Sequence, residues 1–161
     1  MRLLLLLAAS ICWAQNAPHI RDWHPPAGEN KTAPKRSCRD VHQMTGYDLT
    51  VLTAEGGSFC RVTLLVQPEI RIEVSLPAEW NNRLYMFGNG GYAGESLEAP
   101  NRVANRNTAL GHGFVVAQTN TGHDAAKEPL ATFTVNPQKL ADYAFRSLHV
   151  TAESAKRVAE F

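Results

Sequence analysis

The chain has 161 residues, of which 44% are hydrophobic and 19% are charged, and its formal net charge at pH 7 is +1. This length suits one compact domain, and the hydrophobic content excludes a wholly disordered chain. The near-zero net charge, with no basic run longer than Lys35-Arg36, argues against a general nucleic-acid binder, which needs clustered Lys and Arg side chains against the phosphates.

The N-terminus has the residue order of a secretory signal peptide. Met1-Arg2 supplies a positive charge, residues 3–9 are an unbroken apolar run, and Cys12 and Ala14 place small residues before a cut after Ala14. The apolar run is shorter than the ~20 residues that span a bilayer. We therefore expect residues 1–14 to be removed and the protein to be secreted or periplasmic, without a membrane segment. A buried N-terminal helix or strand is the alternative.

Two cysteines remain after this cut, Cys38 and Cys60, and export would place them where disulfides form. An even number of cysteines in an exported chain favours a disulfide, and two buried free thiols are the alternative. Residues 15–36 are rich in proline and predict an extended arm with little regular structure. The folded domain is then expected to span residues 37–161.

Alternating apolar residues predict two neighbouring strands. Val62, Leu64 and Val66 alternate with more polar residues, and residues 70–76 repeat the pattern after a short turn at residues 67–69 that contains proline. Two such runs joined by a short turn are typical of an antiparallel hairpin.

A different pattern follows the hairpin. Residues 84–87 form a continuous apolar run, which predicts a strand covered on both faces, and the glycine-rich residues 88–94 come directly after it. Residues 101–111 favour a helix, and residues 114–117 favour a second buried strand. The order strand, loop, helix, strand predicts a βαβ unit with a parallel strand pair, and hence an α/β fold.

The last part of the chain changes to helical periodicity. After a polar loop at residues 119–134, Asn136 can cap a helix that has Pro137 at its first position and continues to residue 161. The apolar residues of this helix form one face; they are Ala141, Ala144, Phe145, Leu148, Ala152, Ala155 and Ala159.

The glycine-rich loop admits several interpretations. Gly88-x-Gly90-x-x-Ala93 matches a loose dinucleotide-binding pattern, but Pro100 and polar residues separate it from the next helix, and no acidic residue follows about 20 positions on. The backbone amides of such a loop can stabilise a developing oxyanion. A tight turn that needs positive φ is the structural alternative.

Four segments of the sequence resemble the tannase and feruloyl esterase family. Residues 80–84 and 88–94, WNNRL and GNGGYAG, are similar to the family's WNGRF and GNGGFAG. GFVVAQTNTGH at residues 113–123 is similar to GYAVASTDTGH, and KLADYAFRSLHVTA at residues 139–152 is similar to KLADFGYRAVHVTA. The resemblance covers roughly residues 38–161.

The resemblance implies a secreted α/β-hydrolase that cleaves esters of phenolic acids with a Ser-His-Asp triad. In the family the serine lies in a CSTGG-type turn after the last helix, and the Asp, the His and a calcium-holding lid come later. This sequence has no serine in such a turn or in a Gly-x-Ser-x-Gly setting. We therefore expect the N-terminal part of the hydrolase fold, truncated before the nucleophile turn, with no catalytic triad residue, metal or cofactor in this chain.

The resemblance also points to particular residues. Gly90 and Gly91 are the candidates for the oxyanion hole, and Cys38 and Cys60 sit where the family has an early cysteine pair. His123 either lines the active site or ties down its own loop. The expected function is that of a partial ester hydrolase, inactive alone, whose full-length relatives bind phenolic-acid esters. The alternative is a free-standing secreted binding or interaction module without catalysis.

Overall fold

The computed structural model describes residues 23–26 and 29–161, so the predicted signal peptide at residues 1–14 lies outside the described residues. The strands are β1 (Thr50–Gly56), β2 (Phe59–Val66), β3 (Ile70–Pro77), β4 (Leu84–Met86) and β5 (Val115–Thr119). The helical elements are η2 (Cys38–Met44), α1 (Pro100–Gly111), η3 (Thr132–Val135), α2 (Pro137–Ala141), the π-helical turn η4 (Asp142–Arg146) and α3 (Ser147–Glu160). Within the described ranges, no helix is both long and apolar enough to cross a bilayer.

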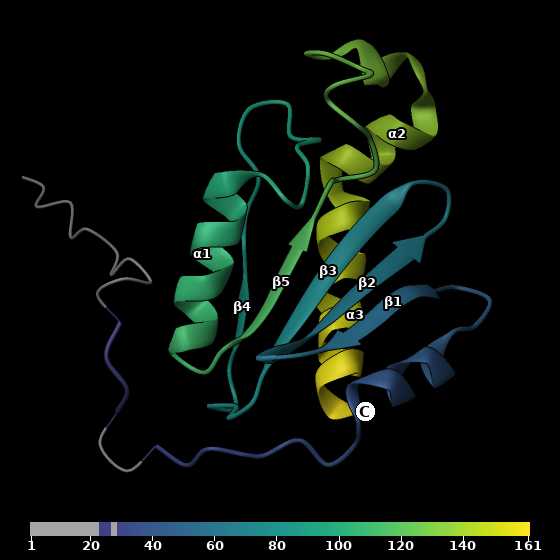
Figure 1. The fold of residues 1–161 in the computed structure, drawn as a ribbon. Helices are drawn as coiled ribbons and strands as arrows, with labels where there is room; N and C mark the ends of the chain where they lie inside the picture. Colours follow the sequence, from purple (N-terminus) through teal and green to yellow (C-terminus); the bar gives the residue numbers. More distant parts are fainter. Residues whose placement is uncertain (1–22, 27–28) are drawn as a thin grey trace, which may run out of the picture.

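The five strands form one mixed sheet with the order β1-β2-β3-β5-β4. Alternate residues of β5 point to opposite faces, so that Val115 and Ala117 pack toward α3 while Val116 packs toward α1. The two helices therefore cover opposite faces of the sheet (Figure 1). This architecture confirms the predicted α/β class.

The predicted hairpin is confirmed, because β2 and β3 pair antiparallel with Val62 opposite Val74. The strand β1 on its outer side was not predicted. Its register on β2 is irregular between Val51 and Thr53, and its buried residues, Val51 and Ala54, are consequently three positions apart. A β-bulge of this kind breaks the two-residue alternation on which strand prediction depends.

The predicted βαβ unit is also confirmed, because β4 and β5 pair parallel, with Leu84 opposite Val115, and α1 connects them. Leu84 and Met86 pack against the core on the α3 side and Tyr85 and Phe87 pack against the cluster on the α1 side, so residues 84–87 are covered on both faces as predicted, although only in part. The strand β4 lies at the edge of the described sheet and its side chains are only half-buried, whereas β5 lies between β3 and β4 and is buried along its whole length.

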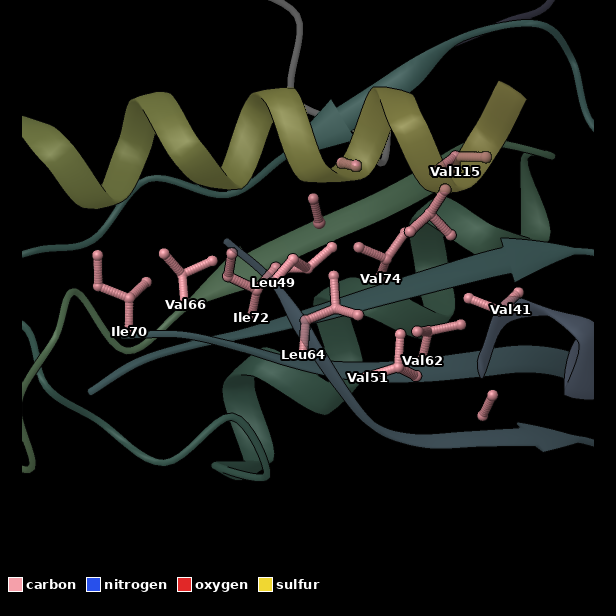
Figure 2. Packing of buried hydrophobic residues seen from close by; sticks show 14 residues of the cluster. Val41, Leu49, Val51, Val62, Leu64, Val66, Ile70, Ile72, Val74 and Val115 are labelled. Carbon is pink, nitrogen blue, oxygen red and sulfur yellow. The ribbon is translucent and has the colours of Figure 1, made fainter. Parts of the chain in front are cut away.

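The main core lies between the sheet and α3. Aliphatic side chains from one face of β2 and β3, among them Val62, Leu64, Ile72 and Val74, meet Val115 and the helix (Figure 2). These four side chains of β2 and β3 are fully buried. Alternation in the hairpin therefore predicts this core correctly.

The long C-terminal helix begins as predicted, because the Asn136 side chain accepts hydrogen bonds from the amides of Gln138 (2.9 Å) and Lys139 (3.3 Å). Its predicted apolar face is wrong in the first turns, where Ala144, Phe145 and Leu148 are exposed, and correct at Ala155, which is buried. Phe145 is 68% exposed and Leu148 is 39% exposed. The π-helical turn η4 adds a residue to one turn and so rotates the following face. The residues that α3 buries are Ser147, Thr151, Ser154, Ala155 and Val158, mostly small side chains that allow close approach to the sheet.

A disulfide joins Cys38 at the start of η2 to Cys60 in β2, with the two Cα atoms 5.5 Å apart, and confirms the predicted pair. In the described part of residues 15–36, Thr32 forms an isolated antiparallel bridge with Trp80. Both connections fasten the N-terminal segment to the same edge of the sheet.

The disulfide makes a testable contribution to stability. Replacing both cysteines by serine is expected to lower the free energy of unfolding by about 3 kcal/mol, because the bridge closes a loop with a sequence separation of 22. Urea denaturation followed by circular dichroism measures the difference. A reductant should destabilise the wild-type chain by the same amount and leave the double variant unchanged. A double variant as stable as the oxidised wild type would contradict the prediction.

Candidate active-site loop

The glycine-rich loop and the segment after β5 lie at the same edge of the sheet (Figure 1). Residues 88–94 follow β4 and residues 120–125 follow β5, and the two strands are parallel. The carboxyl edge of parallel strands is where open α/β sheets bind their ligands. The sheet topology thus brings Gly90, Gly91 and His123 to one edge of the sheet.

The loop exposes its backbone at Gly90 and Gly91. A Cβ atom built at either residue would meet nothing within 4 Å. The amide of Ala93 donates to the carbonyl of Gly90 (2.9 Å), and Gly91 has a φ of +54°, so the segment is also the tight turn that was the structural alternative.

The closed turn fixes the direction of one amide. A trans peptide is planar, so its N–H and C=O groups point in opposite directions. The carbonyl of Gly90 points into the turn toward Ala93, and the Gly91 amide of the same peptide therefore points outward. Among the hydrogen bonds of the described residues, none has the amide of Gly90 or Gly91 as donor. These N–H groups are available to an oxyanion.

Neighbouring side chains hold both ends of the loop. The Asn89 side chain donates to the carbonyl of Thr119 at the end of β5 (3.1 Å). Glu95 pairs with Arg102 of α1 (2.7 Å). Partial burial acts to raise the pKa of the Glu95 carboxyl, but hydrogen bonds from Arg102 and from its own backbone amide outweigh this effect and lower the pKa.

A buried carboxylate beneath the loop ties α1 to the sheet. Glu73 of β3 is 1% exposed, and its carboxylate accepts hydrogen bonds from Arg61 (2.8 Å), Arg106 (2.9 Å) and Gln118 (2.9 Å). Gln118 also donates to the carbonyl of Leu97 (3.1 Å), which holds the chain that follows the loop. Several charge-assisted bonds satisfy this buried charge.

His123 lies within the packing between the two loops. It is 1% exposed, stacks on Phe133 with ring centroids 3.9 Å apart, and has Nδ1 3.4 Å from the Thr121 hydroxyl. Gly94, at a φ of +76°, lies against its other edge, where a Cβ atom would come within 2.5 Å of Nε2. Nε2 of this buried ring has no hydrogen-bond partner within the described residues, so the tying role and the contact of His123 with substrate both stay predictions.

One cavity, of about 830 Å³, lies between Gly94, His123 and alternate side chains along β2, which are Arg61, Thr63 and Leu65. On its wall, Lys139 lies between Glu128 (2.7 Å) and Glu69 (3.0 Å), and the hydrogen bond to Glu128 raises the pKa of Lys139 most. A second, mainly apolar cavity of about 590 Å³ lies at the edge of the sheet opposite the glycine loop, beside the disulfide. Gly90 and Gly91 line neither cavity, so their amides face open surface.

The structure also shows contacts that the sequence did not indicate. The Tyr143 hydroxyl in η4 donates to the carbonyl of Gly91 (2.9 Å).

In residues 23–26 and 29–161, no three His, Cys, Asp or Glu side chains are grouped so as to hold a metal ion.

Comparison with known proteins decides the family. The family model described as tannase and feruloyl esterase matches residues 51–160. The chain belongs to the tannase and feruloyl esterase family. The sequence resemblance is thereby confirmed, and the family is one of carboxylic ester hydrolases.

Individual relatives agree with this assignment. Probable feruloyl esterase B-2 of Aspergillus flavus is 30% identical over 155 residues, which are 91% of this chain and 26% of that protein. Feruloyl esterase B of Aspergillus niger is 36% identical over 94 residues, 56% of this chain and 17% of that protein. The tannase-family chain spans about a quarter of the length of the first of these relatives.

A solved structure shows the same fold. The crystal structure of an esterase from Aspergillus oryzae superposes with a TM-score of 0.61 at 21% identity, over 76% of this chain and 29% of that chain. The mixed sheet with its helices is consistent with the N-terminal portion of an α/β-hydrolase.

The buried carboxylate gives a testable prediction for the tannase-family chain. Glu73→Gln is expected to destabilise the fold by about 3 kcal/mol, because it removes the buried carboxylate 2.9 Å from the Arg106 guanidinium and leaves only the exposed Glu98 at 3.8 Å. Denaturant unfolding measures the loss. As a control, Glu153→Gln removes an exposed partner of Lys156 and is expected to cost less than about 0.5 kcal/mol. Equal losses in the two variants would contradict the prediction.

Proposed function

We propose that this chain provides the oxyanion-binding part of a secreted serine carboxylic ester hydrolase that acts on esters of phenolic acids. The observation that carries the proposal is the pair of exposed amides at Gly90 and Gly91, which have no hydrogen-bond acceptor within the described residues. They lie at the carboxyl edge of a parallel strand pair in a chain of an ester hydrolase family.

The chemistry requires such donors. A serine attacks the ester carbonyl, a histidine accepts its proton and returns it to the leaving alcohol, and an aspartate orients the histidine. The carbonyl oxygen becomes negatively charged in the tetrahedral intermediate, and each N–H donor aimed at it contributes a factor of about 10² to 10³ in kcat. The outward amide of Gly91 is suited to this role, and Gly90 supplies a second candidate.

The nucleophile is proposed to lie outside these 161 residues, because no serine here occupies a Gly-x-Ser-x-Gly or CSTGG turn. The histidine and the aspartate of the triad are assigned there as well. A calcium-holding lid, if present, would also be outside this segment. The 161 residues alone are then inactive as an esterase.

Different observations support the proposed substrate class and the proposed export of the protein. Two of the relatives are named as feruloyl esterases, which favours esters of phenolic acids. The residue order of residues 1–14 and the disulfide between Cys38 and Cys60 both favour export. The individual ester is selected by parts of the enzyme beyond this segment.

A binding module without catalysis is the alternative function. The exposed Phe145 and Leu148 and the half-buried edge strand β4 weigh against it, because a free-standing module would be expected to cover such apolar surface.

The inactivity of the chain alone is directly testable. Residues 15–161, incubated with methyl ferulate or methyl gallate, are expected to release no acid above the uncatalysed rate, measured by chromatography. Turnover that a fluorophosphonate abolishes would show that the nucleophile is present after all. Tight binding of either ester without hydrolysis, by a monomer that unfolds cooperatively, would favour the binding module.

The role of the loop is testable in a chimera in which residues 51–160 replace the matching part of Aspergillus niger feruloyl esterase B. Hydrolysis of methyl ferulate is expected. Gly91→Val should lower kcat at least tenfold, because a β-branched residue is strained at a φ of +54°. Gly88→Val is the matched control, since Gly88 is not an oxyanion candidate, its Cβ also meets open space and its φ is not positive. Equal kcat values in the two variants would contradict a role for this loop conformation.

A further inference from the structure

The geometry points to Tyr143 as a positioning residue that holds the glycine loop, residues 88–94, in the form that directs its amides outward. This inference deepens the proposed function and rests on it. Tyr143 lies in the π-helical turn η4, and its hydroxyl donates to the carbonyl of Gly91 at 2.9 Å, across a sequence separation of 52.

The bond acts on a peptide that is otherwise weakly restrained. The carbonyl of Gly90 is already held by the amide of Ala93, which orients the peptide between Gly90 and Gly91. The next peptide, between Gly91 and Tyr92, is held at its carbonyl by Tyr143. Because a trans peptide is planar, this bond also points the Tyr92 amide away from the helix.

Glycine leaves the peptide that follows it free to rotate. Gly91 has no Cβ and populates positive and negative φ with similar ease, so the peptide that follows it can rotate at little cost. Rotation would turn the Gly91 carbonyl oxygen, a hydrogen-bond acceptor, toward the surface at which an oxyanion would bind. A partial negative charge there would repel the oxyanion. The Tyr143 hydroxyl keeps this carbonyl directed at the helix.

The ring of Tyr143 is fixed independently of its hydroxyl. It lies with its centroid 4.9 Å from that of Phe133 and 6.0 Å from that of His123, in tilted and edge-on arrangements. The π-helical turn places this ring above the loop, and π-helical turns in helices are frequent at functional sites. The family motif that residues 139–152 resemble has Phe at this position, so Tyr143→Phe is compatible with the fold and removes only the hydroxyl.

The experiment is nuclear magnetic resonance of the full chain, labelled with ¹³C and ¹⁵N, as wild type, Tyr143→Phe and Tyr92→Phe. In Tyr143→Phe, the carbonyl ¹³C signal of Gly91 is expected to move upfield and the ¹⁵N order parameters of Gly91 and Tyr92 to fall. Tyr92→Phe is the matched control, since it removes a hydroxyl from the loop itself that makes no hydrogen bond within the described residues.

Two results would overturn the inference. In one, the Gly91 carbonyl signal and the order parameters are the same in Tyr143→Phe as in wild type. In the other, signals change equally in β5 and throughout the core, which would make Tyr143 a general packing residue.

The measurement does not depend on esterase activity, so it separates this inference from the proposed function. In the chimera, Tyr143→Phe is expected to lower kcat several-fold with little change in KM. A changed carbonyl signal together with an unchanged kcat would support the inference that Tyr143 positions the loop. The same result would refute the oxyanion role of the loop.

Discussion

The parallel pairing of β4 with β5 determines where the candidate functional residues lie. It requires a crossover, which α1 supplies, and it places the ends of both strands at one edge of the sheet. The glycine loop and the segment containing His123 meet at that edge because of this pairing alone. The buried carboxylate of Glu73 secures the arrangement, because it binds α1 and β5 to the same point of β3.

Local patterns in the sequence were sufficient for much of the fold. Alternation identified the hairpin β2–β3, and the cap at Asn136 identified the start of the long helix. The features that were missed are those in which a local irregularity disturbs the period. A bulge near Val51 hides β1, and the extra residue in η4 rotates the helix so that Phe145 turns outward. No particular residue type in the sequence indicates either the bulge or the π-helical turn.

At the candidate site too, features set by neighbouring residues could be predicted from the sequence, and contacts between residues far apart in the sequence could not. Clustered glycines revealed Gly90 and Gly91, because exposed backbone amides depend on residues that are adjacent in sequence. The contacts of Glu73 reach residues 12, 33 and 45 positions away, and the Tyr143 bond spans 52 positions. Such pairs become visible only when the topology is known. For His123, the sequence left two roles open, and its stacking on Phe133 is compatible with either role.

The disulfide lies at the edge of the sheet opposite the glycine loop, beside the start of β5. Production in a reducing bacterial cytosol would therefore leave the edge with the glycine loop unaltered while weakening the far end of the domain. The expected symptom is a poor yield of folded material with a normal loop. Periplasmic expression, or oxidative refolding, is consequently the appropriate preparation route for any comparison of loop variants.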